Sequence, residues 1–465
     1  MPRDEKLTTA PGERQSGDGQ TRAAVVVPVL TRRAGGVERN MQRPRMQRSP
    51  EARAVEAVGL ARAIDLDIIH EAVITLNEPR PSTLLGSGKV EELREIVEEK
   101  KAELVIVDHA LTPVQQRNLE KELKAKVLDR TGLILEIFGE RARTKEGVLQ
   151  VDLAHLEYQK GRLVRSWTHL ERQRGGAGFL GGPGETQIEA DRRLLQEKIV
   201  RLKRELEVVR RTRDLHRAKR KKVPFPVVAI VGYTNAGKST LFNHLTGAGV
   251  LAENMLFATL DPTLRRLRLP HGTPIILSDT VGFISDLPTH LVAAFRATLE
   301  EVVEADLILH VRDIADSDTA AQAQDVEQIL ADLGVDPDDD ERVIEVWNKL
   351  DLVEPGARER LLASGPDDGS QPIAISAVKG EGLEALTSAI EARLAGDIIN
   401  LELRLRPDQL ALLDWIYENG DVVAREDRED GGVALHVRTT KAAADDVQAR
   451  LPRTPTPPPD EIAEA

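Results

Sequence analysis

Eight residues in the middle of the chain have the types and spacing needed to hold a chain of phosphates. They run Gly232-Tyr233-Thr234-Asn235-Ala236-Gly237-Lys238-Ser239, after the apolar segment 226–231 and before a helix-forming segment that begins at Thr240. Glycines permit the tight turns and the close backbone approach that phosphates require. The loop amides and the positive end of the helix would face the anion. We predict that Lys238 reaches the terminal phosphates and that the Ser239 hydroxyl binds Mg²⁺.

Two further segments could complete the phosphate and metal site. An apolar strand over 275–278 ends in Asp279-Thr280-Val281-Gly282, where a carboxylate can hold Mg²⁺ and a glycine amide can sense the γ-phosphate. Between this segment and the loop lies Phe257-Ala258-Thr259-Leu260-Asp261-Pro262-Thr263. A switch segment at this place would supply a threonine to the metal and the γ-phosphate. Thr259 is the first choice and Thr263 the second, because spacing does not decide between them.

The identity of the base is indicated by Asn348-Lys349-Leu350-Asp351, which follows the apolar segment 343–347. A carboxylate at Asp351 can accept hydrogen bonds from both the ring N–H and the exocyclic amine of guanine. Adenine lacks this donor pair, so the carboxylate would be left unpaired at a cost of about 1–3 kcal/mol or more. The motifs occur in one order, each at a strand end, and they predict GTP and GDP as ligands.

The predicted site has three overlapping groups of residues. The catalytic group is Lys238, Thr259 and Gly282, and the metal group is Ser239, Thr259 and Asp279. The nucleotide-binding group comprises Gly232, Tyr233, Thr234, Asn235, Ala236, Gly237, Lys238, Ser239, Thr240, Phe257, Ala258, Thr259, Asp279, Thr280, Val281, Gly282, Asn348, Lys349, Leu350, Asp351, Ser376, Ala377 and Val378. The last three end a strand that can support the base.

Phe283 directly follows Gly282. In Ras-type enzymes a glutamine at this position orients the attacking water, and a phenylalanine side chain cannot make that hydrogen bond. We therefore predict that intrinsic hydrolysis is slow unless another residue or a partner positions the water.

Composition sets outer limits on the fold and the environment. The 465 residues can form about three domains of ordinary size. The sequence contains neither a cysteine nor a run of 18 apolar residues, which favours a cytoplasmic protein, with a membrane-associated fraction as the alternative. A net charge of −13 argues against nucleic acid as a partner only if the charge is spread evenly.

The charge is not spread evenly. Residues 192–222 contain 14 Lys/Arg and four acidic residues, a local net charge of +10, and end in Arg217-Ala218-Lys219-Arg220-Lys221-Lys222. Such a segment suits a phosphate backbone, so we predict contact with RNA; a merely solvated helix face is the alternative. The preceding glycine-rich loop 174–184, with Trp167, His169 and Phe179 nearby, could stack on bases or cap a helix pair.

The remaining patterns predict a multi-domain α/β protein. Strands at 23–30, 66–76, 104–108 and 127–129 alternate with helices at 51–63, 89–101 and 113–124, as in a parallel sheet. From about residue 131 to Lys222 we predict long helices separated by one loop. Apolar residues at helical spacing after the loop should pack against an apolar group before it. The first set is Ile188, Leu195, Ile199, Leu202, Leu206 and Val209, and the second is Val148, Leu149, Val151, Leu153 and Leu156. Strands at 398–403 and 432–437, with a helix at 407–417 between them, predict a small α+β domain.

The predicted organisation has six parts. They are a disordered tail (1–20), an N-terminal α/β domain (21–140), a basic antiparallel helical hairpin (141–222), a nucleotide-binding domain with a mostly parallel sheet (223–395), a small α+β domain (396–451) and a second disordered tail (452–465).

Taken together, these motifs resemble the HflX family of GTPases. The resemblance covers about 23–394 and includes, besides the nucleotide motifs, Gly86-Ser87-Gly88-Lys89, Gln115-Gln116-Arg117-Asn118-Leu119, Asp129-Arg130-Thr131, Arg141–Gly147, Gly182–Gln187 and Asp191-Arg192-Arg193. It implies a monomer that binds the 50S ribosomal subunit and its rRNA. It further implies that GTP-dependent splitting or rescue of stalled ribosomes under stress is the activity, with the ribosome as activator.

The sequence departs from the family pattern at a few positions and leaves two other functions open. Leu264, Val378 and the loop residues Ala177 and 179–181 differ from the commoner residues, and none lies in the phosphate loop. One alternative function is ATP-dependent RNA remodelling near Gly86–Lys89, although a plain helix start there is favoured. The other is a signalling switch with a protein effector.

Overall fold

The computed structural model describes residues 20–31, 48–173, 183–220, 225–248, 256–257, 259–285, 299–363, 372–395, 398–428 and 430–451. It has two compact units, one within 1–35 and 53–133 and the other within 36–52 and 134–465. Several sequence predictions fall outside the described residues: the two disordered tails, most of the glycine-rich loop, Ala258 and the end of the basic cluster at Lys221 and Lys222.

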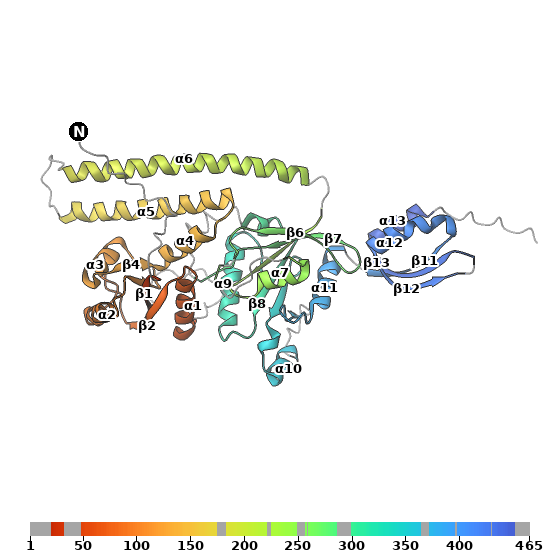
Figure 1. Cartoon of the computed structure of the whole chain (residues 1–465), viewed down its shortest axis with the longest axis horizontal. Coiled ribbons are helices and arrows are strands. Elements are labelled where there is room, and N and C mark those ends of the chain that lie inside the picture. Colours follow the sequence, from red (N-terminus) through yellow and green to blue (C-terminus); the bar gives the residue numbers. More distant parts are fainter. Residues whose placement is uncertain are drawn as a thin grey trace, which may run out of the picture. The chain divides into compact units, whose positions relative to one another are not determined.

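The first unit is built on a four-stranded parallel sheet. Its order is β2 (Asp67–Leu76), β1 (Arg22–Leu30), β3 (Leu104–Val107) and β4 (Lys126–Asp129). Helices α1 (Pro50–Arg62), α2 (Ser87–Lys100) and α3 (Pro113–Leu123) connect the strands (Figure 1). Strand β1 is buried from Ala23 to Val27, as expected for a central strand covered on both faces. The predicted alternation of strands and helices is confirmed.

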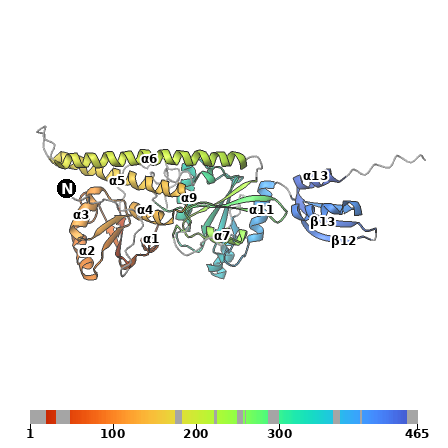
Figure 2. The same ribbon diagram turned by 45° about the horizontal axis from the view of Figure 1, so that its top comes forward.

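Three helices follow the first sheet: α4 (Arg130–Arg141), α5 (Lys145–Gln173) and α6 (Pro183–Arg220). The prediction of a single interruption is wrong, because the helical run also breaks at 142–144. Helices α5 and α6 lie side by side and run antiparallel (Figures 1 and 2). Their shared apolar cluster contains Leu149, Leu153, Leu156, Ile199, Leu202, Leu206 and Val209. The predicted stripe is confirmed for these seven residues. Val148 is 40% exposed, Val151 and Leu195 lie outside this cluster, and the Ile188 side chain is outside the described part of the structure.

The second sheet has the order β10 (Ile373–Ala374), β9 (Val343–Asn348), β8 (Leu307–Asp313), β5 (Val227–Gly232), β7 (Pro274–Asp279) and β6 (Thr263–Arg268). Only β6 is antiparallel to its neighbour. Helices α7 (Lys238–Thr246) and α11 (Leu383–Ala395) share one apolar cluster with the sheet, and α9 (Thr319–Asp332) packs on β8 and β5. In a parallel sheet the carboxyl ends of the strands meet at one edge, where ligands bind.

The last part of the chain is a three-stranded antiparallel sheet, β11 (Ile398–Leu405), β13 (Val433–Thr440) and β12 (Asp421–Asp427). Helices α12 (Leu413–Asn419) and α13 (Lys441–Arg450) complete it (Figure 1). The predicted α+β character is confirmed, but β12 and α13 were not predicted. The predicted helix over 407–417 begins as a 3₁₀ turn, Pro407–Leu412.

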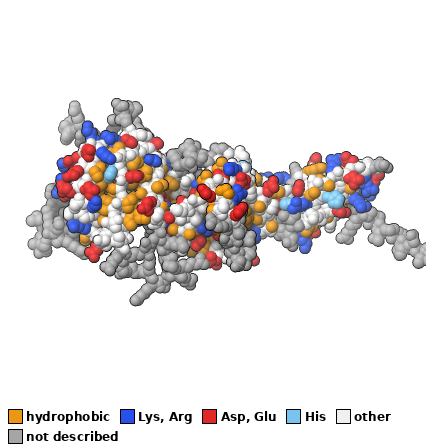
Figure 3. Space-filling model, turned by 90° about the horizontal axis from the view of Figure 1, so that it is seen from below, with side chains coloured by type: hydrophobic (Ala, Val, Ile, Leu, Met, Phe, Trp, Pro, Cys, Tyr) orange, Lys and Arg blue, Asp and Glu red, His pale blue; other side chains and the backbone are white. Residues whose placement is uncertain are grey.

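The surface mixes charged and apolar groups. In Figure 3, hydrophobic side chains gather over the first unit. Exposed apolar residues of this unit include Val55 and Val73, which are 74% and 44% exposed. Within the part of the chain that the structure describes, none of the helices combines the length and the apolar character needed to cross a bilayer.

Candidate nucleotide-binding site

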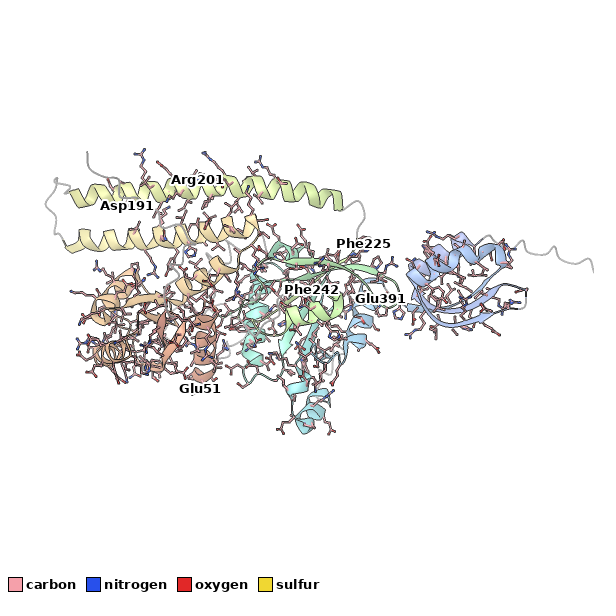
Figure 4. All side chains as sticks on the ribbon, viewed as in Figure 1. Glu51, Asp191, Arg201, Phe225, Phe242 and Glu391 are labelled. Carbon is pink, nitrogen blue, oxygen red and sulfur yellow. The ribbon has the colours of Figure 1, made fainter. Side chains whose placement is uncertain are left out.

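The loop between β5 and α7 has a backbone shape that its glycines make possible. Gly237 has φ +92°, and a Cβ there would lie 2.2 Å from the Asn348 amide nitrogen. Gly232 has φ +152°, and a Cβ there would lie 2.2 Å from the Val311 carbonyl oxygen. Helix α7 is held to the sheet by Leu241 and by Phe242, which Figure 4 labels. The loop is therefore fixed against the strand ends, with the N-terminus of α7 behind it.

Lys238 is buried beneath this loop. Its Nζ donates a hydrogen bond to the Tyr233 carbonyl oxygen at 2.7 Å, across the loop. Burial lowers the pKa of Lys238 to about 8, the nearby Asp279 opposes that change, and Lys349 adds to it. A buried ammonium is costly unless an anion compensates it, so this position favours a bound phosphate.

Three oxygens converge beside Lys238. The Ser239 hydroxyl donates to Asp279 Oδ2 at 2.7 Å, the Thr259 hydroxyl lies 3.0 Å from the same oxygen, and the two hydroxyls are 2.9 Å apart. Ligands of an octahedral Mg²⁺ at 2.0–2.1 Å are separated by about 3 Å along each edge, so these separations fit that ion. Asp279 Oδ1 is buried and has no hydrogen-bond partner among the described residues. Burial raises the pKa of Asp279, and its hydrogen bonds to Ser239 and Thr259 and the Lys238 charge oppose the rise.

The two candidate threonines of the switch segment, Thr259 and Thr263, have different contacts in the structure. Thr259 meets the Ser239 and Asp279 side chains directly. Thr263 begins strand β6 and pairs with Asp279 through the backbone ladder. The arrangement therefore favours Thr259 over Thr263 for the role that spacing alone left open.

The Asp279–Gly282 segment is pressed against the phosphate loop. A Cβ on Gly282 would lie 2.9 Å from Thr234 Cγ2 and 3.1 Å from Lys238 Nζ, so only glycine fits there. The next residue, Phe283, exchanges backbone hydrogen bonds with the loop: its N–H donates to Gly232 and its carbonyl accepts from Thr234. The Phe283 side chain is 2% exposed, so it packs in the interior and offers no hydrogen-bonding group to the site.

The predicted base-binding residues are connected to the phosphate loop by the side-chain amide of Asn348. Asn348 donates from Nδ2 to the Ala236 carbonyl at 2.8 Å and accepts from the Ala377 N–H at 3.0 Å. Asp351 Oδ1 accepts a 2.7 Å hydrogen bond from Ser376, which orients the carboxylate. Lys349 has φ +67° and pairs with Asp313 at 2.6 Å. Val378 is 75% exposed.

The structure thus brings together most of the predicted residues at the carboxyl edge of the second sheet. It also adds contacts that the sequence did not predict. Arg48 stacks over the Tyr233 ring at 5.2 Å and donates to the Tyr233 hydroxyl at 2.8 Å, and that hydroxyl accepts from the Ser285 N–H at 2.9 Å. Arg48 lies in an arginine-rich stretch without a motif, so no local signal could have identified it.

Comparison with known proteins agrees with this geometry. Family models match in chain order: GTP-binding GTPase N-terminal (51–139), GTP-binding GTPase Middle Region (141–220), 50S ribosome-binding GTPase (227–349) and HflX C-terminal domain (364–462). The GTPase HflX of Magnetococcus marinus is 52% identical over 81% of this chain and 85% of its own length. The chain belongs to the HflX GTPase family. The HflX of Escherichia coli is 46% identical over 77% of this chain and 83% of its own length.

Membership of the HflX family makes the chain a GTPase that binds GTP and GDP. A solved structure is also similar, a GTP-binding protein from the hyperthermophilic archaeon Sulfolobus solfataricus in complex with GDP. It is 24% identical, with a TM-score of 0.42 over 80% of this chain and 98% of that one.

Proposed function

We propose that this HflX-family chain binds the 50S ribosomal subunit and its rRNA, and uses GTP to split or rescue stalled ribosomes under stress. It acts as a monomer in the cytoplasm that associates with ribosomes. The observation that carries the proposal is helix α6, a basic helix in an acidic chain whose partner α5 begins beside the nucleotide site. The family description of 227–349, a 50S ribosome-binding GTPase, supports the choice of partner.

Helix α6 presents its positive charge to solvent. Its exposed basic residues include Arg192, Arg193, Lys198, Arg201, Lys203, Arg204 and Arg211. Four of them form surface ion pairs, Arg193–Glu197, Arg201–Glu205, Arg211–Glu207 and Lys203–Glu157. Exposed pairs of this kind contribute only about 0–1 kcal/mol, so they can be exchanged for rRNA phosphates at little cost.

Within the nucleotide site each predicted group has a role. Lys238 binds the terminal phosphates, Gly282 contacts the γ-phosphate through its amide, and Asp351 binds the guanine base. Ser239, Thr259 and Asp279 hold Mg²⁺, which neutralises charge on the β- and γ-phosphates when it is bound. The remaining predicted residues shape the loop or line the base.

The buried Phe283 supports the proposal that hydrolysis depends on a partner. Its side chain cannot orient an attacking water, and its backbone holds the segment against the phosphate loop. We propose that the ribosome completes the catalytic arrangement, so hydrolysis is slow in the free protein and faster on the 50S subunit.

Light scattering of purified 70S ribosomes tests the proposal. Wild-type protein with GTP, or with a non-hydrolysable analogue, is expected to lower the scattering as subunits separate. A triple variant, R192E, K198E and R204E, should lose this effect while it keeps its affinity for GTP. Reversal of two exposed arginines of the C-terminal sheet, R404E and R438E, is the matched control. Unchanged scattering with wild-type protein would contradict the proposal.

The first unit gives no support to the alternative of an ATP site near Gly86–Lys89. Helix α2 simply begins there, with Gly86 as its N-cap. The Lys89 ammonium is bonded to Glu92 at 2.6 Å, and both side chains are more than half exposed. ATP hydrolysis that survives a Lys238→Ala change would revive this alternative.

A further inference from the structure

Thr259 is anchored on both sides by residues of the helical segment. Two positions earlier, Phe257 packs edge-on against Phe138 of α4, with ring centroids 4.8 Å apart and an interplanar angle of 80°. Both rings are almost fully buried. Two positions later, Asp261 is bound to the start of α5. The switch threonine therefore lies on a short segment whose two ends are fixed by α4 and α5.

Asp261 makes three hydrogen bonds to Arg143 and Thr144, the two residues immediately before α5. Its Oδ2 accepts from the backbone N–H groups of Arg143 and Thr144, each at 2.9 Å. Its Oδ1 accepts from the Thr144 hydroxyl at 2.5 Å. That hydroxyl in turn accepts from the Gly147 N–H at 3.0 Å, as a helix N-cap does. The carboxylate thereby joins the switch segment to the first turn of the helix, where unpaired N–H groups and the helix dipole favour a negative charge.

Gly147 makes room for this carboxylate. A Cβ at this position would lie 2.5 Å from Asp261 Oδ1 and 3.1 Å from the Thr144 hydroxyl oxygen. Elsewhere in α5, Gly161 has no atom within 4 Å of the place where a Cβ would stand. The glycine at 147 is therefore required by the contact with Asp261.

We propose that Asp261 is a positioning residue for GTP hydrolysis, which holds Thr259 beside Ser239 and Asp279 by binding the first turn of α5. The inference rests on the role proposed above for Thr259, and it does not require the ribosome. Thr259 and Asp261 are two residues apart, so the bonds of Asp261 to Arg143 and Thr144 restrict how far Thr259 can move from the site. Helix α5 is thus joined to the reaction centre by hydrogen bonds.

Single-turnover GTP hydrolysis by the full chain tests the proposal, with GDP affinity measured in parallel. D261A is expected to lower the hydrolysis rate constant about tenfold or more, because small displacements of reacting groups are costly. GDP affinity should be unchanged, since no γ-phosphate is present. D261N retains one acceptor oxygen for the Arg143 and Thr144 N–H groups, so its rate constant should stay within about threefold of wild type.

The glycine pair supplies a matched control for stability. G147A and G161A both replace a glycine of α5 by a better helix former. Only G147A displaces the Asp261 carboxylate, so it should slow hydrolysis about as much as D261A, whereas G161A should match wild type. Melting temperatures establish that every variant is folded. Equal rates for G147A and G161A would overturn the proposal.

The variant T259A distinguishes the role of Thr259 in hydrolysis from the positioning of Thr259 by Asp261. If T259A hydrolyses GTP at the wild-type rate, the role proposed for Thr259 is wrong. If T259A is slow while D261A and G147A match wild type, Thr259 keeps its role and the positioning by Asp261 is refuted.

Discussion

The parallel first sheet and the mostly parallel second sheet both have buried charged side chains at the carboxyl ends of their strands, and these charges are compensated in different ways. In the first sheet, Arg130 follows β4 and binds Asp108 after β3 and Glu56 of α1, the latter at 2.7 Å. All three side chains are at most 7% exposed. In the second sheet, Asp279 ends β7 with one buried oxygen that has no partner among the described residues, and Lys238 lies nearby.

The contrast distinguishes a structural charge network from a binding site. A buried charge is tolerated when hydrogen bonds and an opposite charge compensate it, and in the first sheet the carboxylates of Asp108 and Glu56 provide the opposite charge for Arg130. In the second sheet burial shifts the pKa of both Lys238 and Asp279 toward their neutral forms, which means that compensation is incomplete. Phosphates and a cation would complete it. Four substitutions test this difference between the two sheets.

Lys238→Ala should have the largest effect. Removal of a cation that stabilises developing negative charge should lower GTP turnover by about 10³-fold or more. Lys89→Ala, at the glycine-containing turn of the first unit, is the matched control and should leave turnover unchanged. Comparable losses in the two variants would place a nucleotide site in the first unit.

Arg130→Ala should destabilise the first unit by about 3–5 kcal/mol, because it leaves two buried carboxylates without their partner. GDP affinity should not change. Hydrogen exchange of the β1 and β3 amides measures the effect locally. Arg53→Ala, which removes a more exposed arginine 3.4 Å from Asp108, should cost less than about 1 kcal/mol. Equal losses for both would refute a buried network centred on Arg130.

Asp351→Asn should weaken GTP binding by about 1–3 kcal/mol, since it replaces one of the two acceptor oxygens that face the guanine donors by an N–H donor. An amide can instead donate to the 2-oxygen of xanthine, so the ratio of XTP to GTP affinity should rise. Competition of both nucleotides against a fluorescent GDP analogue measures that ratio. An unchanged ratio would show that Asp351 does not face the base.

Val378→Lys should have the smallest effect. Val378 is 75% exposed at the edge of the base-binding end, and the longer side chain can cover the base with its methylenes. GDP affinity should rise by no more than about threefold, with turnover unchanged. A larger change would mean that position 378 binds the nucleotide more closely than its exposure indicates.

The sequence predicted the strands and motifs that act locally. A few consecutive residues are enough to identify the loop 232–239, the apolar strands and the end of β7. The structure places these features together. Strand β12 was missed because most of its side chains are exposed and it lacks a clear apolar alternation; it is an edge strand held by β13. The bonds of Asp261 to Arg143 and Thr144 join residues more than 100 positions apart, so no local pattern contains them.

Dependence of hydrolysis on the ribosome can be measured as GTP turnover by the purified chain, alone and with purified 50S or 30S subunits. We expect slow turnover by the chain alone, strong stimulation by 50S subunits and little stimulation by 30S subunits. Charge reversal across Arg217–Lys222 should abolish the stimulation and leave basal turnover intact. Slow turnover that 50S subunits do not accelerate would contradict the claim that the ribosome completes this site, and would favour a protein effector instead.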